Sequence, residues 1–388
     1  MPTSISKSDF LNDPGRRAFL RCCGIGLITL GAGTFSTPAH VRAVGPVQKG
    51  RVNPVRASFM TLISGKVVRC TLCPRQCVIP EGERGFCRTR FNRHGRGYTL
   101  AYGNPCVVNL DPVERLAFLH VLPGSRFLSV ATAGCTFHCA FCENWAFSQA
   151  APEEVYTHDL PPRSVVERAR TMGAQGVAYA YVEPAVFFEY MRDTAREARA
   201  AGLINVIHTN GFIQTAPLRS LCLDLDAAQV DLKAFDDTFY RELCQGRLEP
   251  VLATLKTLRA EGVHVEITNL VIPGRNDAPE GIRAMCDWIV THLGPETPLH
   301  FARFYPLYQL NRLSPTPVRT LEQARSQALA CGLRYVYIAN VPDHEAWNTV
   351  CPDCGARVIH RKGYIVEEAH LRKGCCTFCG RELPGVWE

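Results

Sequence analysis

The feature that most constrains this sequence is a loop of three cysteines, Cys135, Cys139 and Cys142, spaced C-x3-C-x2-C. The loop follows the apolar run Phe127–Thr132, whose composition predicts a buried β-strand. So short a loop can bring three thiolates around one compact metal cluster. A [4Fe–4S] cluster is usually held by four thiolates, so one ligand is missing from the loop. One iron would then be open to a ligand that is not protein. The alternatives are a zinc knuckle, or one disulfide beside a free cysteine.

A second group of cysteines lies nearer the N-terminus and is called here the N-terminal cysteine set: Cys70, Cys73, Cys77 and Cys87. Gly82 and Gly85 permit tight turns between its members. Four thiolates close a coordination sphere, so a structural metal is expected rather than a catalytic one. Zinc and an auxiliary iron–sulfur cluster both fit the spacing, and a pair of disulfides is the alternative.

A third group, the C-terminal cysteine set, consists of two C-x2-C-Gly pairs: Cys351, Cys354, Cys376 and Cys379. Paired knuckles of this kind are typical of a zinc ribbon or a rubredoxin-like site, with zinc as the first choice and iron as the second. Cys375 is an additional cysteine that could replace Cys376 as a ligand.

The bulk composition is that of a soluble globular protein, except for its cysteines. The chain has 388 residues, 46% of them hydrophobic and 20% charged, enough for one large catalytic domain with small additions. Of its 19 cysteines, eight lie outside the three groups, where buried apolar positions are expected for several. The formal charge is +7, and no Lys/Arg stripe with interleaved aromatic residues is present, so no nucleic-acid partner is expected.

Residues 1–43 are expected to form an export leader. The run Arg16–Arg21 resembles a twin-arginine signal, and the apolar run Cys22–Phe35 follows it. This run is too short for a comfortable transmembrane helix, which needs about 20 residues. The expected location is therefore periplasmic or membrane-associated, or cytoplasmic if the leader does not function. Arg42, beside the expected cleavage point near Ala43, departs from the usual signal pattern. A disordered basic N-terminus with an uncleaved interfacial helix is the alternative.

From residue 126 to residue 340, strand-like and helix-like runs alternate, which predicts a parallel sheet with helices between its strands. Gly202 and Gly262 come directly after two of the expected helices, where they favour helix ends. The expected helices include Ser164–Met172, Val186–Ala201, Leu248–Glu261 and Pro279–Leu293. The expected strands are Phe127–Thr132, Val177–Val182, Ile204–His208, Ala227–Leu232, Val263–Val271, Leu299–Phe304 and Tyr335–Ala339.

These patterns predict four parts along the chain: a leader over 1–43, an N-terminal four-cysteine region over 44–125, a catalytic core over 126–340 and a zinc-ribbon-like module over 341–388.

Several motifs together resemble the radical S-adenosylmethionine (radical SAM) enzymes of the AmmeMemoRadiSam system, which are similar to the pyruvate formate-lyase activating enzyme. They are the cysteine-rich start, Asp111-Pro112-Val113-Glu114, Pro123-Gly124-Ser125, and the cysteine loop from Gly134 to Asn144-Trp145. The resemblance covers roughly residues 60–388. It implies an α/β fold, a partial (β/α)6 barrel with small four-cysteine metal-binding modules at both ends. It also implies a [4Fe–4S] cluster at Cys135, Cys139 and Cys142 whose open iron binds SAM.

The resemblance further implies roles for residues at the carboxyl ends of the strands, where barrels carry their chemistry. Glu183 would hold the SAM amino group, and Thr209 and Asn210 would donate hydrogen bonds to SAM. Asp231 and Lys233, on one side of a strand, would hold the SAM carboxylate and the substrate. Asn276 would bind the ribose or adenine. The alternatives are a loop carboxylate for Glu183, a structural ion pair for Asp231 and Lys233, and a plain Pro-Gly turn around Asn276. His208 stands where similar enzymes have Asp, so no cation site is carried over.

The activity implied is reductive cleavage of SAM to a 5′-deoxyadenosyl radical, which takes hydrogen from a substrate. Likeness to activating enzymes suggests a protein glycine, and a peptide or small molecule is equally open. The partners implied are an electron donor of flavodoxin or ferredoxin type and a protein or small-molecule substrate. One alternative function is an iron–sulfur and zinc electron-transfer protein without SAM chemistry. Another is a zinc-ribbon module that binds nucleic acid or a partner, although the weak net charge argues against nucleic acid.

Overall fold

The computed structural model describes residues 47–388. The predicted leader lies outside these residues. At the centre is an eight-stranded sheet in the order β16-β15-β14-β13-β12-β11-β9-β8. The strands are β8 (Val107–Pro112), β9 (Arg126–Ala131), β11 (Gly176–Tyr179), β12 (Ile204–Thr209), β13 (Ala227–Asp231), β14 (His264–Val271), β15 (Leu299–Arg303) and β16 (Val336–Ala339).

Seven of the eight strands are parallel neighbours, and only β8 runs antiparallel to its neighbour, β9. The parallel strands are buried along nearly their whole length, as expected for a parallel sheet covered on both faces, although several of their buried residues are polar. The prediction of an α/β fold built on a parallel sheet is confirmed. The seven predicted strands correspond to the seven parallel strands of the sheet, whereas β8, at its edge, was not expected in it. The predicted boundary at 125/126 therefore separates two paired strands.

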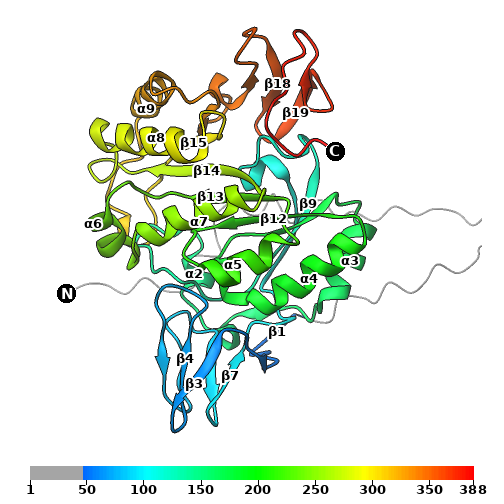
Figure 1. Ribbon diagram of the computed structural model, residues 1–388, viewed down its shortest axis with the longest axis vertical. Coiled ribbons are helices and arrows are strands. Elements are labelled where there is room, and N and C mark those ends of the chain that lie inside the picture. Colours follow the sequence, from blue (N-terminus) through cyan, green and yellow to red (C-terminus); the bar gives the residue numbers. More distant parts are fainter. Residues whose placement is uncertain (1–46) are drawn as a thin grey trace, which may run out of the picture. The chain divides into compact units, whose positions relative to one another are not determined.

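Helices connect the strands in chain order, and in Figure 1 they lie together along one face of the sheet. Two of them end where predicted, because Gly202 and Gly262 adopt φ angles of +76° and +78° just after the last turns. The long helices are α3 (Pro162–Thr171), α4 (Phe188–Ala200), α5 (Thr215–Cys222), α7 (Glu249–Ala260), α8 (Pro279–Leu293) and α9 (Val318–Ala330). The short helices are α2 (Trp145–Ser148) and α6 (Asp237–Phe239).

The N-terminal cysteine set lies among small antiparallel sheets, drawn in blue and cyan in Figure 1. One sheet pairs β3 (Met60–Ser64), β4 (Val67–Cys70) and β5 (Val78–Ile79), and the other pairs β2 (Val55–Arg56), β7 (Arg96–Thr99) and β6 (Arg90–Arg93). In addition, β1 (Gln48–Lys49) pairs with β10 (Tyr156–Thr157).

The C-terminal cysteine set lies in a small module that carries β17 (Thr349–Val350), β18 (Arg357–Lys362), β19 (Ile365–Ala369), β20 (Leu371–Arg372) and β21 (Cys375–Cys376). The chain end returns to the core, where Val386 accepts a hydrogen bond from the backbone of Leu122 and donates one to His120. Within the residues that the structure describes, no helix is long and apolar enough to cross a membrane.

Candidate active site

The cysteine loop leaves β9 at its carboxyl end and is fixed by backbone contacts. Gly134 has a φ angle of +95°, and a Cβ atom there would lie 2.4 Å from the carbonyl oxygen of Cys87, so only glycine fits. The backbone amides of His138 and Ala140 donate to the carbonyl groups of Cys244 and Leu243 at 3.0 and 2.8 Å. The loop is thus held between the N-terminal region and the segment after α6.

The three loop cysteines open into one cavity of about 420 Å³ at the carboxyl ends of the strands, a volume within the range of small-molecule sites. The lining brings together all but one of the residues predicted to bind the cluster, SAM or the substrate: Cys135, Cys139, Cys142, Glu183, Thr209, Asn210, Asp231 and Lys233. These residues come from the ends of four different strands, so only the folded sheet makes them neighbours.

The loop cysteines suit a cluster better than a single ion. All three are free thiols. Burial raises the pKa of Cys135 well above its usual range and also raises that of Cys142, so these thiols would become thiolates only with a bound metal. Among the described residues, no three of these sulfur atoms lie within 4.8 Å of one another, as the ligands of one ion would. Several irons between the sulfurs account for this wider spacing.

Glu183 holds two strand ends together at the cavity wall. Its carboxylate, which is 3% exposed, accepts hydrogen bonds from the Thr209 hydroxyl at 2.8 Å, the Asn210 amide at 2.8 Å and the Ala185 amide at 3.1 Å. Burial outweighs these bonds and raises the pKa of Glu183. Asn210 also contacts the cysteine loop, because its amide group lies 3.6 Å from the sulfur of Cys135.

Asp231 lies between Lys233 and His208 in the cavity. Its two carboxylate oxygens bind Lys233 Nζ at 3.0 Å and His208 Nε2 at 2.9 Å. Burial alone would raise the pKa of Asp231, but the two neighbours outweigh it and hold the pKa well below its usual range. Burial likewise opposes the charge of Lys233, yet Asp231 raises the pKa of Lys233 well above its ordinary value. Asp231 and Lys233 therefore form an ion pair, and His208 contacts the carboxylate of that pair.

Asn276 is the predicted site residue that the cavity does not include. Its amide nitrogen donates to the carbonyl oxygens of Lys233 at 2.6 Å and Leu270 at 2.8 Å, and its oxygen accepts from the amide of Ile272 at 2.6 Å. These bonds use its polar atoms to tie the loop after β14 to the end of β13. These bonds give Asn276 a supporting role in the loop, and its contact with SAM stays a prediction.

The cavity also includes residues that the sequence did not single out, among them Tyr181, Arg115 and Tyr364. Tyr181 has a φ angle of +67°, a strained conformation typical of functional sites, and its hydroxyl donates to Asp111 at 2.7 Å. Asp111 also lies 3.4 Å from Arg115. The Asp-Pro-x-Glu motif was the sequence signal that could have identified Tyr181 and Arg115, because its Asp111 contacts both side chains. Tyr364, from the turn between β18 and β19, had no such signal.

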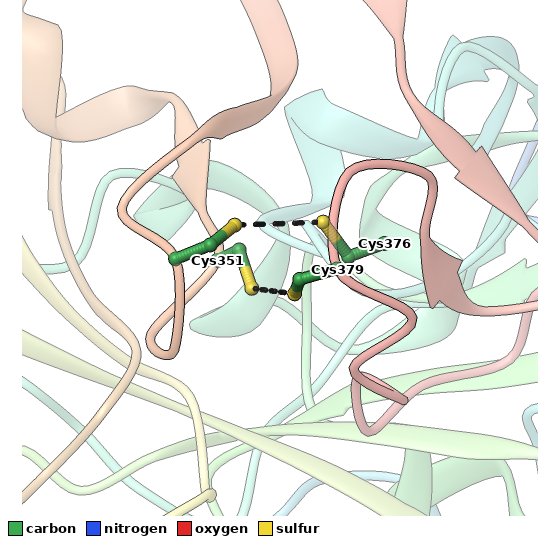
Figure 2. A group of neighbouring side chains, drawn as sticks. Cys351, Cys376 and Cys379 are labelled. Carbon is green, nitrogen blue, oxygen red and sulfur yellow. Dashed lines mark hydrogen bonds between the residues drawn. The ribbon is translucent and has the colours of Figure 1, made fainter.

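The C-terminal cysteine set has the geometry of a site for a single metal ion. Among the described residues it is the one group of three or more Cys, His, Asp or Glu side chains whose ligand atoms all lie within 4.8 Å of one another. The sulfurs of Cys351 and Cys379 are 3.6 Å apart, and those of Cys354 and Cys376 are 3.8 Å apart; Figure 2 shows them converging. A tetrahedral ion with bonds of about 2.3 Å requires about 3.8 Å between sulfurs. Cys375 is not a member of the group.

Comparison with known proteins agrees with this geometry. The family model of the radical SAM superfamily matches residues 129–288. An uncharacterized protein of Methanocaldococcus jannaschii is 42% identical over 332 residues, which are 85% of this chain and 99% of the relative. The pyruvate formate-lyase 1-activating enzyme of Escherichia coli K12 is 25% identical over 219 residues, 52% of this chain and 88% of that enzyme.

The benzylsuccinate synthase activating enzyme of Thauera aromatica is 31% identical over 131 residues, 34% of this chain and 40% of that enzyme. The family implies a [4Fe–4S] cluster and SAM as cofactors, and the three loop thiols facing one open cavity fit that pair. Residues 129–288 therefore form a radical SAM domain, and the chain is homologous to the activating enzymes of pyruvate formate-lyase and benzylsuccinate synthase.

Proposed function

We propose that the protein reductively cleaves SAM in the cavity beside the cysteine loop and uses the resulting 5′-deoxyadenosyl radical to take hydrogen from a substrate. The observation that carries this proposal is the set of three free cysteines, without a fourth in the cavity lining, facing Glu183 and the Asp231–Lys233 pair. When bound, the cluster and SAM supply the one-electron cleavage of the S–C5′ bond; the protein supplies ligands, orientation and exclusion of water.

The chain's own residues divide this work. Cys135, Cys139 and Cys142 would hold the cluster. Lys233 keeps an ammonium group in the cavity, where it can bind the SAM carboxylate or a substrate carboxylate. Asp231 keeps Lys233 charged and fixes its position. The buried Glu183 carboxylate, which also lines the cavity, is the acceptor available for the SAM ammonium group.

The substrate proposed first is a glycine residue of a partner protein, and the homology to two activating enzymes supports it. A peptide or small molecule is the second candidate. The cavity mouth includes Arg115, Asn340 and Tyr364, which offer a cation, an amide and an aromatic ring to a substrate. The reductant would be a flavodoxin or ferredoxin.

We further propose that the C-terminal cysteine set binds zinc. We also propose that the protein is exported by the twin-arginine route, and a fusion of residues 1–43 to a reporter protein tests this export.

The decisive experiment is anaerobic. The purified protein, with its cluster reconstituted, is mixed with dithionite and SAM, and 5′-deoxyadenosine is measured by mass spectrometry. We expect it to form in the wild type and to fall below detection in Cys142→Ala, with the C-terminal metal retained. Cys106→Ala is the matched control, because Cys106 is a free cysteine outside the cavity, and it should cleave SAM at the wild-type rate. Cleavage by Cys142→Ala would contradict the assignment. No cleavage by a reduced wild type would favour an electron carrier.

A further inference from the structure

The N-terminal cysteine set encloses a second, separate cavity. Cys70, Cys73, Cys77 and Cys87 all line it, together with Arg75, Arg90 and Thr136. All four cysteines are free thiols, and no acidic side chain lines the cavity. The void is only about 20 Å³, room for a water molecule but not for an organic ligand. Covalent metal–sulfur bonds of about 2.3 Å bring metal atoms closer to thiolates than water can come.

The spacing of these sulfurs differs from that of a single-ion site. Within residues 47–388, no three members of the N-terminal cysteine set lie within 4.8 Å of one another, whereas all four members of the C-terminal cysteine set do. The three loop cysteines share the wider spacing. The N-terminal cysteine set therefore resembles the cluster-binding loop and not the site with tetrahedral spacing.

Arg90 supplies an independent sign that a ligand belongs in this cavity. Its side chain is 1% exposed and pairs through Nη1 with Glu189 at 2.8 Å. Its Nε and Nη2 atoms have no hydrogen-bond partner among the described residues, although a buried guanidinium N–H without an acceptor is costly. Cluster sulfides and thiolates are acceptors, and they carry the negative charge that a buried cation would stabilise.

We propose that the N-terminal cysteine set holds a second iron–sulfur cluster, ligated by all four cysteines, and not zinc or disulfides. Four protein ligands leave no open iron, so this cluster would not bind SAM. It would lie next to the first one, since Thr136 lines its cavity and directly follows Cys135, and Arg75 Nε donates to the Thr136 carbonyl at 2.8 Å. The proposal stands on its own geometry and does not depend on SAM cleavage.

The test removes the first cluster and asks what remains. In the full chain with Cys135, Cys139 and Cys142 all changed to Ala, isolated anaerobically, we expect equal amounts of iron and sulfide, about two or four of each per chain. Reduction should give an electron paramagnetic resonance signal that is unchanged by added SAM. A variant that retains zinc at two per chain but no iron would overturn the proposal. So would four N-terminal thiols that resist alkylation until a disulfide is reduced.

A second variant excludes adventitious iron. Adding Cys73→Ser and Cys77→Ser to the triple variant should abolish the remaining iron and sulfide, while Cys222→Ser, which changes a cysteine outside all three groups, should not. The zinc content of the C-terminal cysteine set serves as the measure that the chain is still folded. Iron that persists in the five-fold variant with the zinc site intact would overturn the assignment to these cysteines. Because none of these readouts involves SAM cleavage, failure here is distinguishable from failure of the proposed function.

Discussion

The two ends of the described chain each carry four cysteines, yet they present them differently. In the C-terminal cysteine set the sulfurs of opposite pairs are 3.6 and 3.8 Å apart, the edge length of a tetrahedral site, and two of its cysteines are exposed. In the N-terminal cysteine set the sulfurs are wider apart around a buried void. The comparison teaches that the number of thiols says little about the metal, whereas the distance between them says much.

Both regions are nevertheless joined to the central α/β part of the protein by the same kind of contact, a buried pair of Arg and Glu. Arg90 of β6 reaches Glu189 of α4 at 2.8 Å. Arg361 of β18 reaches Glu114 at 3.7 Å and donates to the carbonyl oxygen of Leu119 at 2.8 Å. Neither region is therefore an independent attachment, and variants at each end can be compared directly.

The largest effect is expected for Cys351→Ala, which removes a fully buried ligand of the C-terminal cysteine set. Structural zinc contributes about 10–16 kcal/mol of binding free energy in small peptide domains, so the variant should lose its metal and more than about 5 kcal/mol of stability in that module. Metal analysis and thermal unfolding measure both. Cys375→Ala is the control, because Cys375 lies beside the set without belonging to it, and it should keep the metal. An unchanged melting temperature in Cys351→Ala would break the comparison.

The next effect concerns the two anchoring pairs. Arg90→Met and Arg361→Met each leave a buried glutamate without its cation, which costs about 3–5 kcal/mol. Arg163→Met is the matched control: its partner Glu167 is four residues away on an exposed helix face, where such pairs contribute about 0.3–0.5 kcal/mol. Chemical denaturation of the metal-loaded proteins measures the loss. If only one of the buried pairs matters, the two ends are not anchored alike.

The smallest expected effect is a pH dependence of the free energy of unfolding. It arises from His120, a buried residue that contacts the C-terminal region. His120 is buried, accepts a hydrogen bond from the Tyr337 hydroxyl at 2.6 Å and donates to the Pro384 carbonyl at 2.6 Å. Burial, opposed by Glu266 and assisted by His264, lowers the pKa of His120 to about 3. Below its unfolded pKa of about 6.5, the unfolded chain binds a proton that the folded chain does not, so stability falls as pH falls.

This loss should reach about 1.4 kcal/mol between pH 7.5 and pH 5.5. Over the same pH interval, the free energy of unfolding of the His120→Gln variant should fall by about 1.4 kcal/mol less than that of the wild type. The free energy of unfolding is measured for both proteins at both pH values. Metal content is measured at each pH, so that metal release is not mistaken for the titration. An identical drop in variant and wild type would show that His120 is not the group responsible.

Features close together in the sequence were predictable. The spacing of the loop cysteines, the residues at the ends of β11, β12 and β13, and the glycines after two helices all carried local signals. The backbone contacts of Asn276 were not predictable, because a motif gives a residue's place in the chain but not the carbonyl groups that its side chain will bind.

What the sequence could not provide depends on contacts between distant segments. Tyr364 reaches the cavity only because the β18–β19 turn folds back to it, and Tyr181 is oriented by Asp111 from the antiparallel strand β8. The distances between sulfurs in the two four-cysteine sets are likewise a tertiary property. The C-x2-C spacing occurs in both sets, so the sequence alone does not tell them apart. Only the folded structure shows that the sulfurs are close together in the C-terminal cysteine set and wider apart in the N-terminal cysteine set.

The close approach of Gly134 to the carbonyl oxygen of Cys87 bears on how such an enzyme can be rebuilt. The loop that carries Cys135, Cys139 and Cys142 packs directly on the backbone of Cys87 from the N-terminal cysteine set, with no space for a methyl group between them. A chimaera that exchanges the barrel loop with a homologue while retaining the original N-terminal region would bring together two surfaces not shaped for each other. The two segments, far apart in the chain, are best inherited and transplanted together.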